Sequence, residues 1–347
     1  MTGKQSRFVD RESPPYPYNP PMLLAADVGG TKTAIGLFTS SQGKLRRARH
    51  AVYPSQAARS FESIARRFLS DGKERVHACA VGVAGPVVDG RSSLVNLPWV
   101  VDRRRIARLL GIDRVNVIND LEATAWGIPH LPSSQIVSLT PRTRPRLGNA
   151  AVIAAGTGLG MAILFWDGTV HRPSAGEGGH QSFAPRNARE AALLRHVSER
   201  FGRASIERIV SGPGLSNILD FLAAGRGGVP PKLASRMAAG DPNAAIAEAG
   251  LHRDDALAEE ALDLFVSLYG AAAGDLALVA RATAGVYVAG GIVRKILPKV
   301  RSGSFLEAFR AKGRLAKFVS GIPVRVILDP ETALIGAAAC AARAGLE

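Results

Sequence analysis

The sequence predicts a mixed α/β protein made of two similar halves that face each other across a cleft. Residues 23–38 and 151–165 both run from an apolar strand, through a turn of glycine and threonine, into a second apolar strand. Strand-like and helix-like segments alternate along the rest of the chain, which is typical of mixed α/β proteins. The 347 residues are enough for two domains with substantial cores.

The composition is that of a globular protein, with 46% hydrophobic and 21% charged residues. No apolar run approaches the roughly 20 residues of a membrane-spanning helix, so we expect no contact with a membrane. Residues 1–21 are polar and rich in proline, without the apolar centre of a secretory signal. We expect them to form a disordered extension.

Cysteine content and charge bear on metal binding, cellular location and nucleic-acid binding. Cys79 and Cys340 cannot supply a four-cysteine zinc site, and both lie in apolar stretches, so we expect no structural zinc and a cytoplasmic location. The net charge is +15, but the basic residues are spread along the chain without a recognition motif for nucleic acid. We interpret the clusters at 46–49 and 103–105 as solvated faces and expect no nucleic-acid partner.

The first half begins with the hairpin at 23–38. Further strands are predicted at 45–53, 77–83 and 114–118, and helices at 61–69 and around 106–110.

The turn of the first hairpin has the chemistry of a phosphate site. Asp27 is followed by Gly29, Gly30 and Thr31, and the chain then continues as a strand. P-loops and dinucleotide fingerprints open a helix instead, so neither pattern is present. Bare backbone N–H groups and the Thr31 hydroxyl suit an anion, and Asp27 suits a hydrated cation. The alternative is an ordinary hairpin, but the recurrence of the pattern at 156–160 argues against it.

Asn119 and Asp120 follow the strand at 114–118 and precede a helix. Ligands of open α/β sheets collect beyond the carboxyl ends of strands, so Asp120 stands where chemistry is expected. The sequence alone gives equal weight to a second role, in which Asp120 caps the following helix.

Glu177 and His180 lie three positions apart among glycines. A carboxylate that accepts hydrogen bonds from two hydroxyl groups and an imidazole that donates or accepts one describe a polar site on a flexible backbone. Metal ligation and a plain surface loop are the alternatives.

In the second half, a helix is predicted at 188–201. Glu207 heads an apolar segment that stops at Gly212 and Pro213, as a carboxylate in the first turn of a helix would. The chain is then mainly helical to about 282, including 256–279. Strands follow at 285–289 and 323–328, and a final helix starts near 331. Gly290 and Gly291 could admit a flat adenosine against bare backbone.

Taken together, these motifs resemble the bacterial glucokinases of the hexokinase and actin-like ATPase superfamily. The matching segments are 27–31, 118–120, 156–160, 176–180, 205–215 and 289–293. They occur in the order and spacing of that family from about residue 22 to the end of the chain.

The resemblance implies a two-domain actin-like ATPase (ribonuclease H-like) fold. A small α/β domain would cover residues 22–119, completed by the last helix at about 331–347, and a larger α+β domain would cover 120–330. It also implies a homodimer that phosphorylates the 6-hydroxyl of glucose with ATP and Mg²⁺.

The resemblance also assigns roles to individual residues. Asp120 would be the catalytic base, and the sugar would be bound by Asn119, Asp120, Glu177, His180 and Glu207. The nucleotide would be bound by Asp27, Gly29, Gly30, Thr31, Thr157, Gly158, Gly290 and Gly291, with Asp27 holding Mg²⁺ through water.

Three departures and three alternatives accompany this interpretation. Lys32 stands where close glucokinase relatives often have asparagine, the cysteine-rich zinc motif of the related repressor/kinase branch is missing, and residues 1–21 have no counterpart. The alternatives are a kinase for another hexose, a kinase that uses polyphosphate, and a non-catalytic sugar-sensing regulator. The regulator would need a DNA-reading module, for which 21 proline-rich residues are too short.

Overall fold

A computed structural model describes residues 21–70, 72, 74–94, 97–141 and 146–344. Apart from Pro21, the predicted N-terminal extension lies outside the described residues, as does the end of the predicted last helix at 345–347.

The first sheet has the strand order β3-β2-β1-β4-β7. Its strands are β1 (Met22–Val28), β2 (Lys32–Ser41), β3 (Lys44–Pro54), β4 (Val76–Val83) and β7 (Val115–Asn119). β1, β2 and β3 are antiparallel neighbours, whereas β1, β4 and β7 run parallel. The helices α1 (Phe61–Ser70) and α2 (Arg103–Leu110) pack on one face through an apolar cluster that includes Phe61, Phe68 and Ile106. A small ribbon, β5 (Arg91–Ser93) and β6 (Val100–Asp102), precedes α2.

The second sheet repeats this plan, with the order β11-β10-β9-β12-β13-β8. Its strands are β8 (Ile136–Ser138), β9 (Ala150–Ala155), β10 (Leu159–Trp166), β11 (His171–Gly176), β12 (Gly285–Ala289) and β13 (Val324–Ile327). An antiparallel β9–β10–β11 meander continues into the parallel strands β12 and β13. The predicted duplication into two similar halves is therefore confirmed, and the short edge strand β8 is an addition that no sequence signal indicated.

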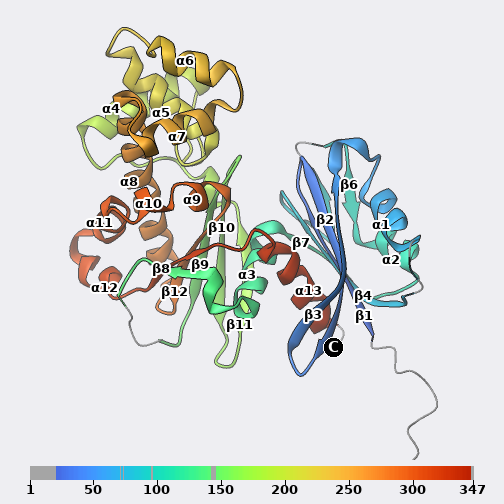
Figure 1. Cartoon of the computed structure of the whole chain (residues 1–347). Coiled ribbons are helices and arrows are strands. Elements are labelled where there is room, and N and C mark those ends of the chain that lie inside the picture. The colour runs from blue at the N-terminus through green and yellow to red at the C-terminus, as the bar shows by residue number, and fades with distance from the viewer. Residues whose placement is uncertain (1–20, 71, 73, 95–96, 142–145, 345–347) are drawn as a thin grey trace, which may run out of the picture.

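Two helices lie between the sheets (Figure 1): α3 (Asp120–Gly127) and α13 (Thr332–Ala344). Leu334 and Ala337 of α13 pack in one cluster with residues of the first sheet, including Leu23 and Ala25. By contrast, α3 packs on the second sheet through Leu121 and Ala125.

The helices α3 and α13 cross at two glycines. A Cβ atom at Gly336 would lie 1.7 Å from the carbonyl oxygen of Ala123, and one at Gly127 would lie 2.2 Å from that of Thr332. Only glycine permits this approach, so the two backbones touch directly.

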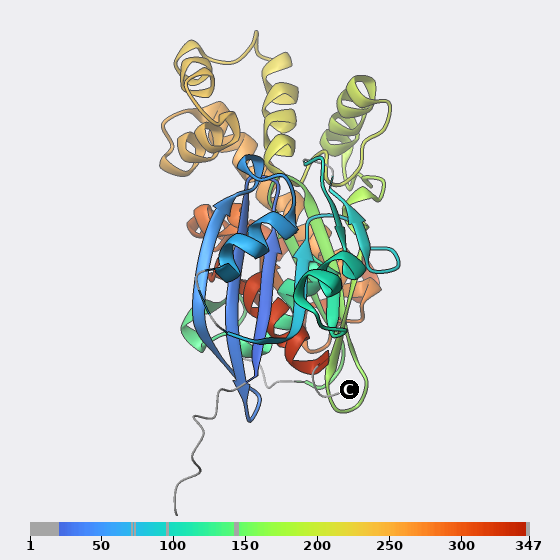
Figure 2. The same cartoon turned by 90° about the vertical axis from the view of Figure 1, so that its right-hand side faces the viewer.

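The outer face of the second sheet is covered by helices centred on α8 (Ala256–Val279), and α4 to α7 gather at one end of the molecule (Figures 1 and 2). The other helices of the second half are α4 (Ala188–Phe201), α5 (Gly212–Ala224), α6 (Pro231–Ala238), α7 (Pro242–His252), α9 (Gly291–Lys295), α10 (Leu297–Val300), α11 (Ser304–Arg310) and α12 (Ala316–Ser320). Single 3₁₀ turns are η1 (Ser55–Ala57), η2 (Ile128–His130), η3 (Ser133–Gln135), η4 (Gly178–His180) and η5 (Gly313–Leu315).

The length and hydropathy of α8 correct the expectation that no segment reaches the size of a membrane span. By length and composition alone this helix of 24 residues could cross a membrane. However, 72% of its most apolar stretch is buried inside the protein, where Phe265 and Tyr269 belong to the main apolar cluster. Its hydropathy is therefore explained by its place in the core.

Candidate active site

The edge of the first sheet that faces the second half carries Asn119 and Asp120. Asn119 caps α3, because its Oδ1 accepts hydrogen bonds from the amide nitrogens of Leu121 and Glu122 at 2.8 and 3.4 Å. Its Nδ2 donates to the carbonyl oxygen of Gly85 at 3.1 Å. The capping role that the sequence offered to Asp120 therefore belongs to Asn119, and Asp120 is the first residue of the helix.

Asp120 is a half-buried carboxylate whose charge is disfavoured. Its pKa is raised from 3.8 to about 7, mainly by burial and also by the negative charges of Asp27 and Glu177, against a hydrogen bond from the Leu121 amide. Repulsion of this kind requires the three groups to face one region. They come from β1, α3 and the turn after β11, so the fold brings together residues that lie up to 150 positions apart.

Asp27 is the last but one residue of β1 and pairs with Ala34 of β2 and Gly82 of β4. Burial raises its pKa from 3.8 to about 6, and the positive charge of Lys32 opposes this rise. The carboxylate therefore lies near the end of β1, just before the first glycine turn, and feels the positive charge of Lys32.

The second glycine turn connects β9 and β10 and is closed by a hydrogen bond from the Gly156 amide to the Gly158 carbonyl at 2.8 Å. The Gly156 carbonyl in turn accepts from the amide of Gly212, the first residue of α5, at 2.8 Å. Thr157 is exposed at the tip. This turn therefore lies against the start of α5, and the Gly212 amide fixes the position of the Gly156 carbonyl.

Glu207 lies beside this turn. Its Oε2 accepts a hydrogen bond from the Leu159 amide at 2.9 Å, and a Cβ atom at Gly158 would lie 2.5 Å from the same oxygen. The expectation that Glu207 occupies the first turn of a helix is wrong, because residues 205–211 form turns and α5 begins only at Gly212. Ser211 caps that helix by accepting from the Gly214 amide.

Glu177 and His180 frame the 3₁₀ turn η4, and both side chains are exposed. The turn is fixed rather than flexible. The Glu207 amide donates to the Gly179 carbonyl at 2.9 Å, and a Cβ atom at Gly179 would lie 2.0 Å from the Leu159 carbonyl oxygen. Arg203 also donates to the His180 carbonyl at 2.8 Å. Glu177, His180 and Glu207 therefore form one polar group next to the second glycine turn.

A cavity of about 200 Å³ opens beside Gly156 and Thr157. It is also lined by the start of α5, by α7 and by α9, through Gly212, Pro213, Leu215, Asp241, Asn243, Ala244, Ala247, Ile292, Lys295 and Ile296. No sequence pattern had indicated the α7 residues or the end of α9 at Lys295 and Ile296. A possible signal was the Asp-Pro-Asn start of α7, where Asp241 accepts from the Asn243 amide.

Gly290 and Gly291, predicted to border an adenosine, are outside the residues that line this cavity, although Gly291 is the first residue of α9. Gly290 has a φ of +96°, and a Cβ atom there would lie 2.4 Å from the Ala155 carbonyl oxygen. Its glycine is therefore required by close packing of β12 against β9.

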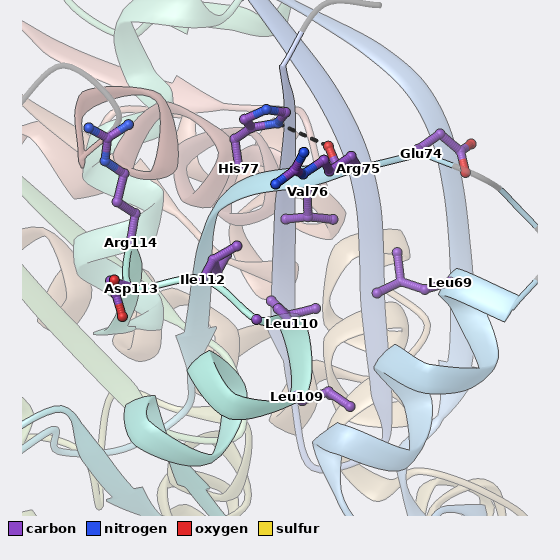
Figure 3. A pocket seen from close by; sticks show the side chains of 11 residues that line it. Leu69, Glu74, Arg75, Val76, His77, Leu109, Leu110, Ile112, Asp113 and Arg114 are labelled. Carbon is purple, nitrogen blue, oxygen red and sulfur yellow. Dashed lines mark hydrogen bonds between the residues drawn. The ribbon is translucent and has the colours of Figure 1, made fainter.

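A larger hollow of about 510 Å³ lies at the opposite end of the first sheet (Figure 3). Its walls include Arg75 and His77 at the start of β4 and Ile112 after α2, and His77 Nδ1 lies 3.0 Å from the Arg75 carbonyl oxygen. β4 separates this hollow from the glycine turns by its length of about 20 Å. It is therefore distinct from the site formed by the carboxylates.

Among the described residues, no group of three or more His, Cys, Asp and Glu side chains is arranged to hold a metal ion. Metal ligation by the Glu177–His180 turn thus gains no further ligands from that part of the chain.

Solved structures with the same fold include sugar kinases and a transcriptional regulator of the ROK family. A glucokinase from an Antarctic psychrotroph superposes with a TM-score of 0.82 at 28% identity, covering 93% of this chain and 99% of that one. A glucokinase from Balamuthia mandrillaris, solved in complex with glucose, shares the fold with a TM-score of 0.75 at 20% identity, covering 93% and 94%. The fold is therefore the two-domain actin-like ATPase fold, which this chain shares with these glucokinases.

Sequence comparison narrows this class. The glucokinase family model matches residues 24–344. The glucokinase of Trichormus variabilis is 38% identical over 340 residues, covering 93% of this chain and 99% of that protein. The glucokinase of Yersinia pestis is 33% identical over 317 residues, covering 91% and 95%. The chain belongs to the glucokinase family.

Proposed function

We propose that this protein transfers the γ-phosphoryl group of ATP to the 6-hydroxyl of glucose, with Asp120 as the general base. The observation that carries the proposal is the carboxylate of Asp120 at the junction of β7 and α3, with a pKa raised to about 7. A general base works best when its pKa is near the working pH, because it is then both available and basic. The glucokinase relatives supply the substrate class.

The sugar is held by hydrogen bonds from both halves. Glu177, whose charge acts on Asp120, contributes a carboxylate together with the imidazole of His180 and the carboxylate of Glu207. Asn119 retains one N–H of its amide for a ligand after its contacts with Gly85 and α3. Carboxylates that engage adjacent hydroxyls impose selectivity, because a sugar that lacks the matching hydroxyl loses a charge-assisted hydrogen bond.

The phosphates lie between the two glycine turns. Gly29, Gly30 and Thr31 bind from the first half, and Thr157 and Gly158 bind from the second. Adenosine occupies the cavity beside Thr157, where Ile292 and Ile296 offer apolar contacts on one side and Asn243 offers an amide on the other. The apolar walls suit the flat base, and the two turns suit its negatively charged tail.

Mg²⁺ fits the carboxylate of Asp27. A hard cation prefers oxygen ligands and keeps several waters. Burial disfavours the ionised form of Asp27, and a positive charge, such as that of Lys32, favours it. When bound, the ion would compensate the charge of the transferred phosphoryl group.

The residues of the chain perform the other steps. Asp120 accepts the proton of the 6-hydroxyl as that oxygen attacks the phosphorus atom. The glycine turns keep the donor in line, since the loose transition state needs alignment and charge compensation more than covalent help. Closure of the two halves around the sugar excludes water and limits hydrolysis of ATP.

We further propose a small domain of residues 22–119 completed by α13, a large domain of residues 120–330, a homodimer and a cytoplasmic location. The contact of α13 with the first sheet supports the domain division. The two buried free thiols, Cys79 and Cys340, suit a reducing compartment. Light scattering would measure the oligomeric state.

The test of the proposed function is release of ADP from ATP and Mg²⁺, measured with glucose, mannose, fructose and N-acetylglucosamine and without sugar. We expect the highest kcat/KM with glucose and little release without sugar. Equal release with and without sugar, in folded protein, would contradict the proposal.

A further inference from the structure

The first glycine turn is held from behind by Ser55, the first residue of η1 after β3. The hydroxyl of Ser55 donates to the carbonyl oxygen of Gly29 at 2.8 Å. Its backbone amide donates to the carbonyl oxygen of Thr31 at 2.9 Å. One residue outside the turn therefore binds the first and the last carbonyl of the three-residue segment that links β1 to β2.

Ser55 is in turn fixed by Thr33, whose Oγ1 lies 2.9 Å from Ser55 Oγ. Because the only proton of the Ser55 hydroxyl goes to Gly29, Thr33 is the donor in this pair. Both side chains are fully buried. The hydroxyls thus form a directed chain from Thr33 through Ser55 to Gly29, shielded from competing water.

These hydrogen bonds determine which backbone groups of the turn can face a ligand. The backbone N–H groups of a turn form an anion-binding concavity only when the carbonyl groups point away from the anion. In the second half, the Gly212 amide holds the Gly156 carbonyl in the same way, at 2.8 Å. Among the residues that the structure describes, the Gly29 carbonyl receives the Ser55 hydroxyl and not a backbone amide.

We propose that Ser55 is a positioning residue for the phosphate-binding turn 29–31 and thereby sets the affinity for the nucleoside triphosphate. Ser55 does not touch the substrate. The inference rests on the proposed function for the nature of the ligand. It adds that loss of the Ser55 hydroxyl weakens the binding of the nucleotide and leaves the binding of the sugar unchanged.

The test compares three variants of the full chain by calorimetry with ATP and Mg²⁺ and by steady-state kinetics. Ser55→Ala removes the donor to Gly29. Thr33→Val removes only the donor to Ser55. Ser92→Ala is the matched control, because Ser92 is a buried serine of the same half whose hydroxyl has no partner among the described residues.

For Ser55→Ala we expect Kd and KM for ATP to rise about tenfold, the cost of roughly one buried hydrogen bond, while KM for glucose changes less than twofold. Thr33→Val should shift the ATP constants in the same direction by a smaller factor. Ser92→Ala should leave both substrates unaffected.

A lower melting temperature of Ser55→Ala with an unchanged Kd for ATP would overturn the proposal, since the serine would then serve only stability. If Ser55→Ala fails to fold, the decision passes to Thr33→Val, and an unchanged Kd for ATP in that variant also overturns it. If the parent chain binds ATP but phosphorylates no sugar, the proposed function fails, and the comparison of ATP binding still decides the role of Ser55.

Discussion

The carboxylate of Glu207 accepts a hydrogen bond from the backbone amide of Leu159 at 2.9 Å, although the two residues are 48 positions apart. This bond ties a proposed sugar ligand to the strand that leaves the second glycine turn. Gly158 makes the contact possible, because any larger residue would place its Cβ 2.5 Å from the Glu207 oxygen. The bond thus links Glu207, a proposed sugar ligand, directly to the glycine turn that is proposed to bind the phosphates.

Gly158→Ala should therefore damage both sides of the site. Displacing Glu207 breaks its bond to Leu159, and we expect kcat/KM for glucose to fall at least about tenfold, as for the loss of a charged hydrogen bond. Gly225→Ala is the control, since the nearest atom to its added Cβ would be 3.9 Å away and its φ is ordinary. Equal kinetics in the two variants would show that the Glu207–Leu159 contact is dispensable.

Asp120→Asn tests the general base. The amide keeps the size of the side chain but cannot accept the hydroxyl proton, so we expect kcat to fall by at least about two orders of magnitude with sugar binding retained. Glu122→Gln, in the same helix, is the matched control. Turnover of Asp120→Asn close to that of the parent chain would remove Asp120 from the role of base.

Glu177→Gln should weaken binding of glucose more than binding of ATP. The neutral amide accepts hydroxyl hydrogen bonds more weakly than a carboxylate does, whereas the phosphates lie at the glycine turns. Calorimetry with each ligand measures the two effects separately. A larger loss for ATP would reassign Glu177 to the nucleotide.

The pH dependence of kcat/KM should report the charge around Asp120. The base is active when ionised, so kcat/KM should rise with pH, with a midpoint near pH 7, and level off about one pH unit higher. Because the negative charge of Glu177 raises the pKa of Asp120, Glu177→Gln should move this rise to lower pH. A midpoint that stays in place, or moves to higher pH, would mean that the rise has another origin.

The unfolding free energy should fall as pH rises, whereas kcat/KM rises, because both depend on the ionisation of Asp120. The folded protein holds the Asp120 proton up to about pH 7, and the unfolded chain releases it near 3.8, so the folded state loses stability as pH rises between these values. Asp120→Asn removes this loss. We expect the variant to exceed the parent in unfolding free energy by about 1–3 kcal/mol at pH 8, with a smaller difference near pH 4. Denaturant titrations at both pH values would measure it, and a variant less stable at pH 8 would contradict it.

Local patterns predicted much of the fold. The hairpin at 23–38 and the helix at 256–279 were predictable because apolar spacing and glycine turns are properties of neighbouring residues. Similar turns in the two halves predicted the duplication, which the matching strand orders confirm. The edge strand β8 was not predictable, since its three residues gain their place only by pairing with β13.

The sequence motifs predicted which residues belong to the site, but not which residues they contact. The motifs indicated Asp120, Glu177 and Glu207, but Glu207 was assigned to a helix because its partner, Leu159, lies far away in sequence. Gly290 was interpreted as a ligand contact, whereas its φ of +96° and its contact with Ala155 are tertiary properties. Ser55 gave no signal, as a serine after a strand is commonplace until its partners are known.

The glycine crossing of α3 and α13 makes a pivot. The polypeptide passes between the sheets at 119–120 and again at 328–331, and the helices that follow these passages meet at Gly127 and Gly336. Backbones that touch without side chains leave few ridges to oppose a change in crossing angle. Asp120 begins α3 about 10 Å from Gly127. A change in the crossing angle would therefore move Asp120, the proposed base, only a short distance.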